Sequence, residues 1–408
     1  MKQKKSFFII IMFIILFVYT TNIDKIPSEI VLFQNQDYEI SYMKGINLEG
    51  ENVSVADTFF RNFAKISGNY VGDEKITLSV FGGAIKKDIN VSVLPKTNVI
   101  LGGDTVGIRL YSEGVLVIGE MPVQGMDGNY YEPYSATKIE KGDIITKIND
   151  VPVETIEELT ELVNNSDEEK ISIEYKKDDT VIKEEMVPVK AFGDNLKKLG
   201  LWVKDGVMGV GTLTFYDPEN KMYAALGHGI SDTEVKELIN VDTGKINVAS
   251  ILDVTKGAKD APGEIKGLLN DDIQIGTIEK NNLSGIFGEF TDNSNYFRGR
   301  KSVEIAAKNE VKLGKAKVIC TVDGDNYPKE YDIEILKIAT DSNSYSRGMT
   351  IKVTDSQLLE KTGGIIQGMS GSPIIQEGKL IGAVTHVYVK DPTKGYAIFA
   401  ETMLKEMD

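Results

Sequence analysis

The chain has 408 residues and is poor in the side chains that build disulfides and metal clusters. It contains one cysteine, Cys320, and two histidines, His228 and His386. A single cysteine cannot form an intrachain disulfide, and so few thiols and imidazoles exclude a cysteine- or histidine-rich zinc site. We therefore expect a protein with no metal and no cofactor.

Positive charge and proline are also scarce. The chain has 46 Lys and Arg against 61 Asp and Glu, a net charge of −15, with 11 prolines and 41% hydrophobic residues. Binding to nucleic acid through its phosphates requires an excess of basic residues, so nucleic acid is excluded as the main partner. The composition is globular, which excludes disorder, collagen and coiled coil. The length predicts two to three domains.

The N-terminus is typical of an export segment. Three basic residues, Lys2, Lys4 and Lys5, precede an unbroken apolar run from Phe7 to Tyr19. The run is shorter than the roughly 20 residues of a comfortable membrane span, yet no A-x-A cleavage site follows it. Residues 1–22 are therefore a cleaved signal or an uncleaved anchor, with the anchor favoured, and in both cases the rest of the chain is exported.

Residues 23–96 are predicted to form a β-rich region without visible chemistry. Lys75 to Phe81 and Lys87 to Leu94 have the period of two expected for strands, and Gly82-Gly83 lies between them.

Residues 97–190 resemble a PDZ domain. Gly142-Asp143 makes a turn into an apolar strand, Asn149-Asp150 makes the turn out of it, and a helix with an apolar stripe follows. In PDZ domains a peptide adds as an extra strand between a glycine-containing strand and this helix. The resemblance implies a peptide groove lined by Gly107, Ile108, Leu110, Leu159 and Leu162.

Residues 191–408 carry the candidate chemistry. His228 lies between Gly227 and Gly229 directly after an apolar strand, where the absence of a Cβ on both sides permits close backbone approach. This is a poor place for a packing histidine, so His228 is a candidate general base.

A second motif in the same region, G-M-S-G-S-P at residues 368–373, is followed by an apolar hairpin. It resembles the nucleophile turn of chymotrypsin-like serine peptidases. The resemblance implies that Ser370 is the nucleophile and that the N–H groups of Gly368 and Ser370 form the oxyanion hole. The expected fold class is therefore mostly β, with a PDZ domain followed by a chymotrypsin-like double β-barrel.

The order of these parts, with A-L-G-H-G before G-M-S-G-S-P, resembles the stage IV sporulation protein B family of endospore-forming bacteria. The resemblance implies a signalling serine endopeptidase in the space between forespore and mother cell. There it would cleave the exported part of a membrane-bound inhibitor, which releases an intramembrane protease that acts on a precursor sigma factor.

The third member of the catalytic triad has two candidates. The family resemblance points to Asp355, whereas the usual chymotrypsin spacing favours Asp253. Either carboxylate would have to bond one ring nitrogen of His228 and fix its tautomer.

Two further side chains are assigned roles outside the triad. His386, at the end of the strand after the nucleophile, is interpreted as a recognition or positioning residue, and Cys320 as a small buried hydrophobe.

Two other function classes fit the sequence less well. An exported quality-control peptidase of the HtrA kind places its peptidase before its PDZ domain, against the order here. A non-enzymatic PDZ adaptor would tolerate loss of Ser370 or His228, and both are present.

Overall fold

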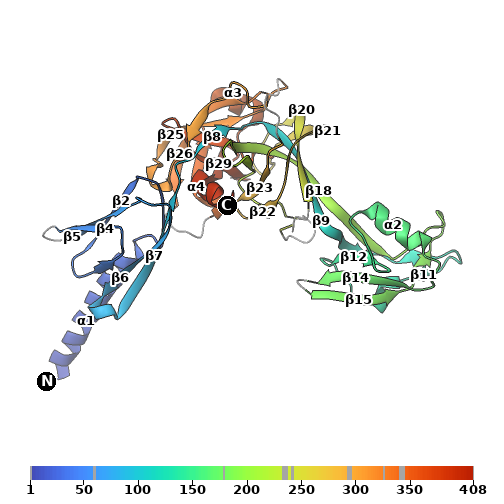
Figure 1. The fold of residues 1–408 in the computed structure, drawn as a ribbon, viewed down its shortest axis with the longest axis horizontal. Coiled ribbons are helices and arrows are strands. Elements are labelled where there is room, and N and C mark those ends of the chain that lie inside the picture. Colours follow the sequence, from blue (N-terminus) through green and yellow to red (C-terminus); the bar gives the residue numbers. More distant parts are fainter. Residues whose placement is uncertain are drawn as a thin grey trace.

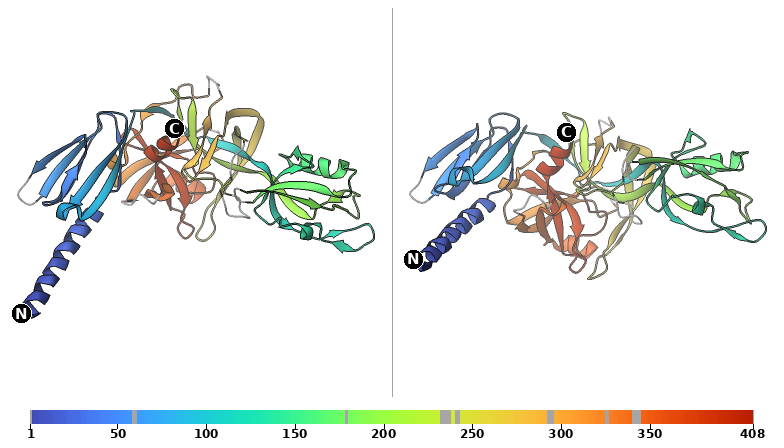
Figure 2. Two further views of the ribbon diagram at one scale, coloured as in Figure 1. Left: turned by 60° about the horizontal axis from the view of Figure 1, so that its bottom comes forward. Right: turned by 90° about the horizontal axis from the view of Figure 1, so that it is seen from below.

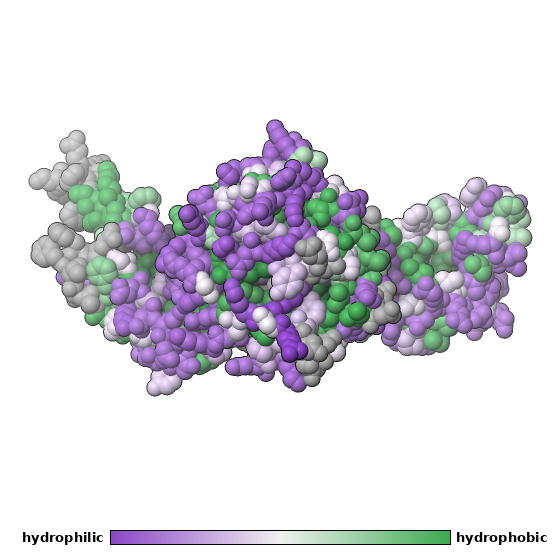
Figure 3. Space-filling model, turned by 90° about the horizontal axis from the view of Figure 1, so that it is seen from above, coloured by the Kyte–Doolittle hydropathy of each residue, from purple (hydrophilic) through white to green (hydrophobic). Residues whose placement is uncertain are grey.

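The computed structural model describes residues 2–57, 61–177, 180–231, 238–239, 243–291, 296–324, 327–339 and 345–407. The fold is mostly β and is arranged as three units in a row, with the peptidase unit in the centre (Figure 1). An N-terminal β unit lies at one end and the PDZ unit at the other, and the two further views show the same order (Figure 2). The face seen from above is largely hydrophilic, with hydrophobic patches over the central and PDZ units (Figure 3).

Helix α1 (Lys2–Asp24) projects away from the N-terminal unit (Figure 1). Its last turn is fastened to that unit, because the Lys87 ammonium donates to the carbonyls of Ile23 at 3.1 Å and Asp24 at 3.3 Å. A cation at this position also complements the negative end of the helix dipole. Tyr19 donates from its hydroxyl to the Lys44 carbonyl at 2.8 Å. In the part of the chain that is described, no helix combines the length and the hydropathy needed to span a bilayer.

The N-terminal unit packs two sheets against each other. One is built from β1 (Glu29–Phe33), β7 (Ile85–Leu94), β6 (Gly72–Val80) and β3 (Asn47–Glu49), and the other from β2 (Asp37–Met43), β5 (Arg61–Ser67) and β4 (Val53–Asp57). The alternating apolar side chains of both sheets form one core, which includes Leu32, Ile66, Ile76, Leu78 and Ile89. The β6–β7 hairpin with its turn at Phe81–Gly83 confirms the two strands expected there.

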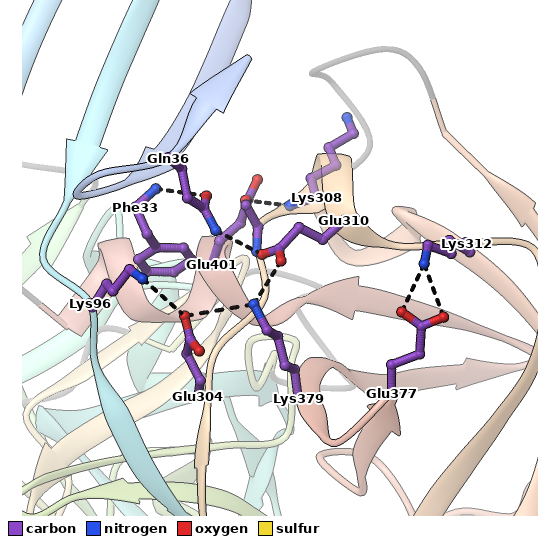
Figure 4. Close-up of polar contacts among 11 residues, drawn as sticks. Phe33, Gln36, Lys96, Glu304, Lys308, Glu310, Lys312, Glu377, Lys379 and Glu401 are labelled. Atoms are coloured by element: carbon purple, nitrogen blue, oxygen red, sulfur yellow. Dashed lines mark hydrogen bonds and ion pairs between the residues drawn. The ribbon is translucent and has the colours of Figure 1, made fainter. Parts of the chain in front are cut away.

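Polar contacts and one aromatic side chain join this unit to the peptidase (Figure 4). Phe33 is buried in a cluster with residues of α4 (Ala400–Met407), and Gln36 donates to the Glu310 carboxylate at 3.0 Å. Lys379 pairs with Glu310 at 2.7 Å and with Glu304 at 3.6 Å. The two units therefore share an apolar contact with a polar border.

The first half of the peptidase unit is an antiparallel sheet. Its strands are β8 (Asn98–Leu101), β9 (Thr105–Glu120), β18 (Leu201–Asp217), β19 (Met222–Ala225), β20 (Thr243–Thr255), β21 (Glu264–Thr277), β22 (Lys280–Asn282), β23 (Gly285–Glu289) and β24 (Ser302–Glu304). The first part of β9 pairs with β18 on one side and with β20 on the other.

The second half is a closed six-stranded barrel in the order β25-β26-β27-β30-β29-β28. Its strands are β25 (Gly314–Cys320), β26 (Lys329–Ile338), β27 (Met349–Val353), β28 (Pro373–Gln376), β29 (Lys379–Val387) and β30 (Lys394–Phe399). The short helix α3 (Ser356–Thr362) connects β27 to the loop before β28. This double arrangement of β structure is the chymotrypsin-like fold that the sequence predicts.

The PDZ unit is inserted into the peptidase rather than placed before it. The strands β9 and β18 form one long ribbon that runs from the central unit into the PDZ unit, with pairs from Thr105↔Thr212 to Glu120↔Leu201. Between them lie β10 (Val123–Gln124), β11 (Tyr130–Tyr131), β12 (Ile144–Ile148), β13 (Val151–Pro152), α2 (Ile156–Asn165), β14 (Ile171–Lys177), β15 (Thr180–Met186), β16 (Val189–Lys190) and β17 (Lys197–Lys198).

This insertion changes the boundaries expected at residues 97 and 191. The structure places the first half of β9 in the peptidase sheet, because Val106, Ile108 and Leu110 bury their side chains in a core with strands β19, β20 and β23. The PDZ core instead begins at Val115 and Val117, after the ribbon has left the peptidase.

Candidate active site

His228 follows strand β19 in a tight turn that requires glycine on both sides. Gly227 has φ +70°, and a Cβ there would lie 2.9 Å from Ile398. A Cβ on Gly229 would lie 2.5 Å from the main-chain oxygen of Asn282, a distance that a side chain cannot occupy without a shift of the backbone. The close backbone approach inferred from the Gly-His-Gly sequence is confirmed.

The ring of His228 is half-buried, and its Nδ1 lies 2.8 Å from the main-chain oxygen of Gly229. Because a carbonyl oxygen can only accept, Nδ1 carries the proton, and Nε2 is left as the acceptor that a general base needs. Burial lowers the pKa of His228 below its ordinary value, and the bond to Gly229 offsets part of that effect. His228 is therefore held neutral and in the tautomer suited to accept a proton.

Asn281 fixes the loop that follows His228. Its side-chain oxygen accepts from the Ile230 N–H at 2.8 Å, and its amide donates to the carbonyls of Ile230 and Ile239. Sequence reasoning missed this residue, because an asparagine in the strand β22 carries no motif that links it to a loop 51 positions earlier.

Ser370 lies in a turn that also depends on glycine. Gly371 has φ +95°, and a Cβ there would lie 2.0 Å from the Thr212 oxygen. Thr212, fully buried in β18, donates its main-chain N–H to the Ser370 oxygen at 2.9 Å and its hydroxyl to the Gly368 oxygen at 2.7 Å. One residue of the first half thus holds both ends of the nucleophile turn, and sequence reasoning had no signal for it.

The backbone N–H groups of Gly368 and Ser370 have no hydrogen-bond acceptor among the residues that the structure describes. Gly368 has φ +95°, so the turn bends sharply between these two groups. Two free donors flanking a serine in such a turn are the arrangement that stabilises an oxyanion. The geometry agrees with the oxyanion hole that the resemblance implies, whose catalytic role stays a prediction.

The end of strand β29 contacts both candidate catalytic residues. The Ser370 hydroxyl donates to the Thr385 carbonyl at 2.7 Å, and the next residue, His386, places its ring 4.8 Å from the ring of His228. The site is therefore built from both halves of the peptidase. Burial is the main cause that lowers the pKa of His386 to about 4, and the charges of His228 and Arg347 add to it.

The two aspartates considered for the triad are placed elsewhere. Asp355 caps the N-terminus of α3, where its carboxylate accepts from the N–H groups of Gln357 at 2.9 Å and Leu358 at 3.1 Å. Asp253 is exposed on β20 opposite Lys266. Within the described ranges, no hydrogen bond joins either carboxylate to His228. Membership of Asp355 or Asp253 in a triad stays a prediction.

Cys320 is buried in the barrel core, where burial raises its pKa well above the ordinary value. A thiol of this kind is a packing group and a weak nucleophile. Among the described residues, no group of three His, Cys, Asp or Glu side chains is placed to hold a metal ion.

The peptide groove of the PDZ unit differs from the one expected. Gly107, Ile108 and Leu110 lie in the peptidase sheet. The Leu269 side chain packs on Gly107, where a Cβ would lie 2.3 Å from it. Of the expected helix residues, Leu159 lines a groove and Leu162 packs on the PDZ core.

The groove lies between α2 and the start of β18 and has a volume of about 490 Å³. Its lining includes Ile156, Leu159, Val163, Leu199, Leu201 and Val203. The loop Leu199-Gly200-Leu201-Trp202 is similar to the carboxylate-binding loop of PDZ domains, and Gly200 has the required φ of +73°. Sequence reasoning missed it because this loop stands at the C-terminal end of the PDZ unit, beyond the expected boundary.

Comparison with known proteins decides the family. Residues 195–404, slightly more than half of the chain, match the SpoIVB peptidase S55 family. The chain belongs to this family. It is therefore a serine endopeptidase, and the fold, the Gly-His-Gly turn and the Ser370 turn agree with that activity. A search of curated proteins gave no match.

Three solved structures are similar to parts of this SpoIVB-family peptidase. The PDZ domain of the SdrC-like protein from Listeria monocytogenes is 19% identical, over 23% of this chain and 90% of that one, with a TM-score of 0.19. An inactive serine-to-alanine mutant of Rv3671c from M. tuberculosis is 13% identical, over 48% and 81%, with a TM-score of 0.27. The HtrA-type protease AlgW with a decapeptide is 13% identical, over 53% and 54%, with a TM-score of 0.28.

Proposed function

We propose that this serine endopeptidase is an exported sporulation signalling enzyme. Its substrate is the extracytoplasmic part of a membrane-bound inhibitor, and cleavage of that inhibitor activates an intramembrane protease that processes a precursor sigma factor. Family membership supports the sporulation role. The observation that carries the peptidase chemistry is that Ser370, with two free N–H donors, and His228 contact consecutive residues at the end of β29.

Hydrolysis follows from the positions of these groups. The Ser370 hydroxyl leaves the Thr385 carbonyl, gives its proton to Nε2 of His228, and its oxygen bonds to the carbonyl carbon of the substrate. The negative charge that develops on the substrate oxygen is stabilised by the N–H groups of Gly368 and Ser370. His228 then gives the proton to the leaving amine, and a water molecule completes the cycle by hydrolysing the ester formed on Ser370.

Export and retention at a membrane surface form the second part of the proposal. Apolar side chains of α1 such as Met12, Phe13 and Phe17 are exposed, with Phe17 68% accessible. The end of the same helix is fixed to the folded N-terminal unit through Lys87 and Tyr19. A helix that is exposed from Met12 to Phe17 and packed at Tyr19 suits an uncleaved anchor, because cleavage near residue 22 would remove Tyr19 from its contact with the N-terminal unit.

The PDZ groove completes the proposed function by delivering the substrate. A groove tethered to the peptidase raises the local concentration of a bound segment, which reaches the millimolar range for short tethers. The tether here is the β9–β18 ribbon, whose two paired strands run from the peptidase into the PDZ unit.

A fluorophosphonate probe tests the catalytic part of the proposal. The full chain should be labelled, and Ser370→Ala should abolish both labelling and cleavage of a protein substrate. Ser372→Ala is the matched control, since Ser372 is buried next to the turn and should leave labelling intact. Labelling that survives in Ser370→Ala would overturn the assignment. A chain that is never labelled would instead favour a non-enzymatic PDZ adaptor.

The substrate part needs a second experiment. Sporulating cells that carry Ser370→Ala should accumulate the intact inhibitor and the unprocessed sigma precursor. Normal processing in that strain, together with broad degradation of unfolded proteins by the purified enzyme, would favour a quality-control peptidase of the HtrA kind.

A further inference from the structure

Three neighbouring side chains, from β29, from β30 and from the turn Tyr345–Arg347, extend from the reaction centre. His386, whose ring contacts His228, is the cross-strand neighbour of Tyr396. The guanidinium carbon of Arg347 lies 4.9 Å from the centre of the Tyr396 ring. Stacking on an aromatic face restricts a long side chain that would otherwise be free in solvent.

The turn that carries Arg347 is attached to the same residue that holds the nucleophile. Thr385 donates its hydroxyl to the Ser346 carbonyl at 2.6 Å, and its own carbonyl accepts from the Ser370 hydroxyl at 2.7 Å. Ser346 and Arg347 belong to a single short turn, Tyr345–Arg347. The turn that carries Arg347 and the nucleophile are therefore both held by Thr385.

The charges near the two histidines are unbalanced. Arg347 is exposed and forms no ion pair with any carboxylate in the described part of this acidic chain. Burial lowers the pKa of both histidines, and Arg347 and His228 lower that of His386 further. With His386 neutral at pH 7, Arg347 is a fixed positive charge beside it.

We propose that Arg347, supported by Tyr396 and bordered by His386, is a specificity residue that selects substrates with an aspartate or glutamate side chain close to the scissile bond. The proposal rests on the proposed peptidase function and names a class of substrate for it. A guanidinium presents two parallel N–H groups, which match the two oxygens of a carboxylate.

The size of the preference follows from the exposure of Arg347. An ion pair in contact with solvent contributes less than a buried one, so we expect a discrimination of about tenfold rather than several orders of magnitude. For the same reason the preference should weaken as salt is added.

The test uses the full chain in detergent and internally quenched peptides that cover all residue types at each position around the cleaved bond. From the best cleaved sequence, a matched set is made with Glu, Gln or Lys at each flanking position. In the wild-type protein we expect kcat/KM to be about tenfold higher for Glu than for Gln at one position, and lowest for Lys.

Variants then assign that preference to Arg347. Arg347→Gln should bring the Glu to Gln ratio close to one, Arg347→Glu should reverse the order of Glu and Lys, and Arg347→Lys should retain part of the preference. Arg298→Gln, an exposed arginine elsewhere in the peptidase unit, is the control and should keep the wild-type ratio.

The outcomes separate this inference from the proposed function. A wild-type protein that is labelled by fluorophosphonate but shows no acidic preference overturns the role of Arg347 and leaves the peptidase intact. The same holds if Arg347→Glu retains the wild-type order, with thermal unfolding showing that it is folded. A wild-type protein that is not labelled at all overturns the peptidase function, and the inference with it.

Discussion

The hydroxyl of Ser370 is bonded to the main-chain carbonyl of Thr385, 2.7 Å away, while His228 bonds the carbonyl of its own neighbour. The Ser370 hydroxyl is thus bonded to a carbonyl oxygen, which is too weak a base to remove its proton. Rotation of one side-chain torsion releases the hydroxyl, and substrate that pairs with β29 would compete for the same carbonyl. We therefore expect substrate binding along β29 to favour release of the Ser370 hydroxyl from the Thr385 carbonyl.

The pH dependence of turnover should report the environment of His228. Its pKa is lowered by burial, and a general base must be neutral, so activity should persist below pH 6.5, the ordinary value for histidine. We expect the midpoint of the acidic limb of kcat/KM to lie below that value. Measurements on the full chain from pH 4.5 to 8 with one quenched peptide give this midpoint directly.

The ring of His386 covers one side of His228, so its removal tests whether burial lowers the pKa of His228. His386→Ala uncovers one side of His228, which reduces the desolvation of that ring and should move the midpoint up toward 6.5. A limb that stays in place, or one that lies above 6.5 in the wild type, contradicts burial as the origin.

Asp355→Asn separates two roles of one residue. As an N-cap, asparagine replaces aspartate with nearly equal strength, so the free energy of unfolding should change by less than about 0.5 kcal/mol. As the triad member that the family resemblance implies, asparagine costs roughly 10⁴ in kcat through the wrong tautomer. We expect a folded and inactive variant, checked by denaturant unfolding and peptide turnover on one preparation.

The alternative outcome has a clear structural meaning. Full turnover in Asp355→Asn would confine Asp355 to capping α3 and leave the Gly229 carbonyl as the group that orients His228. Asp253→Asn, at an exposed position on β20, serves as the comparison and should retain activity.

The stability of the joint between the N-terminal unit and the peptidase should depend on pH through Glu401. This side chain lies within the cluster in Figure 4 and is 4% exposed, and burial raises its pKa from 4.5 to about 7, although it accepts from the Lys308 N–H at 2.6 Å. The folded protein therefore binds this proton more tightly than the unfolded chain. Stability should fall as the pH rises from about 4.5 through 7, by at most about 3 kcal/mol.

Glu401→Gln removes the titration and keeps an oxygen for the Lys308 N–H. Thermal unfolding should find the variant more stable than the wild type at pH 8 and nearly equal to it at pH 5. Glu360→Gln, at an exposed site on α3, should follow the wild type at both pH values. A gain that is the same at pH 5 and pH 8 would show that Glu401 is not the titrating group.

Sequence patterns predicted the parts of this molecule whose signals are local. The period of two around Gly82-Gly83, the Gly-His-Gly turn and the Ser370 turn each lie within a few residues, and glycine is required there by backbone geometry. The position of β9 could not be predicted in this way. An apolar strand such as Val106 to Leu110 suits a PDZ sheet and a peptidase sheet equally, and long-range pairing with β18 and β20 decides between them.

Contacts between distant segments explain the remaining differences at the site. Thr212 bonds a residue 156 positions away, and Asn281 bonds one 51 positions away. Neither a threonine nor an asparagine indicates such a role by its residue type alone. Family resemblance points to Asp355, and in the structure its carboxylate accepts from the first turn of α3, since aspartate before a helix is among the best N-caps, so its place in a triad stays a prediction.

The inserted position of the PDZ unit makes a clean deletion possible, and this tests substrate delivery. In the β9–β18 ribbon Tyr111 pairs with Gly206, so residues 112–205 can be replaced by a two-residue Asn-Gly turn that closes the ribbon as a hairpin. The strands below this point stay paired with β20 and keep the core of the first half.

In this deletion variant we expect hydrolysis of a short peptide ester to remain within a few fold of the full chain. Cleavage of the protein substrate should slow by a factor of about 10² or more, as loss of a tether of millimolar effective concentration implies. Leu196→Asp in the intact chain is the matched point variant, since Leu196 lines the groove from an exposed position and its replacement leaves the PDZ core and the ribbon unchanged. Equal losses on ester and protein in a folded deletion variant would show that the PDZ unit supports the peptidase fold, and delivery through the groove would be refuted.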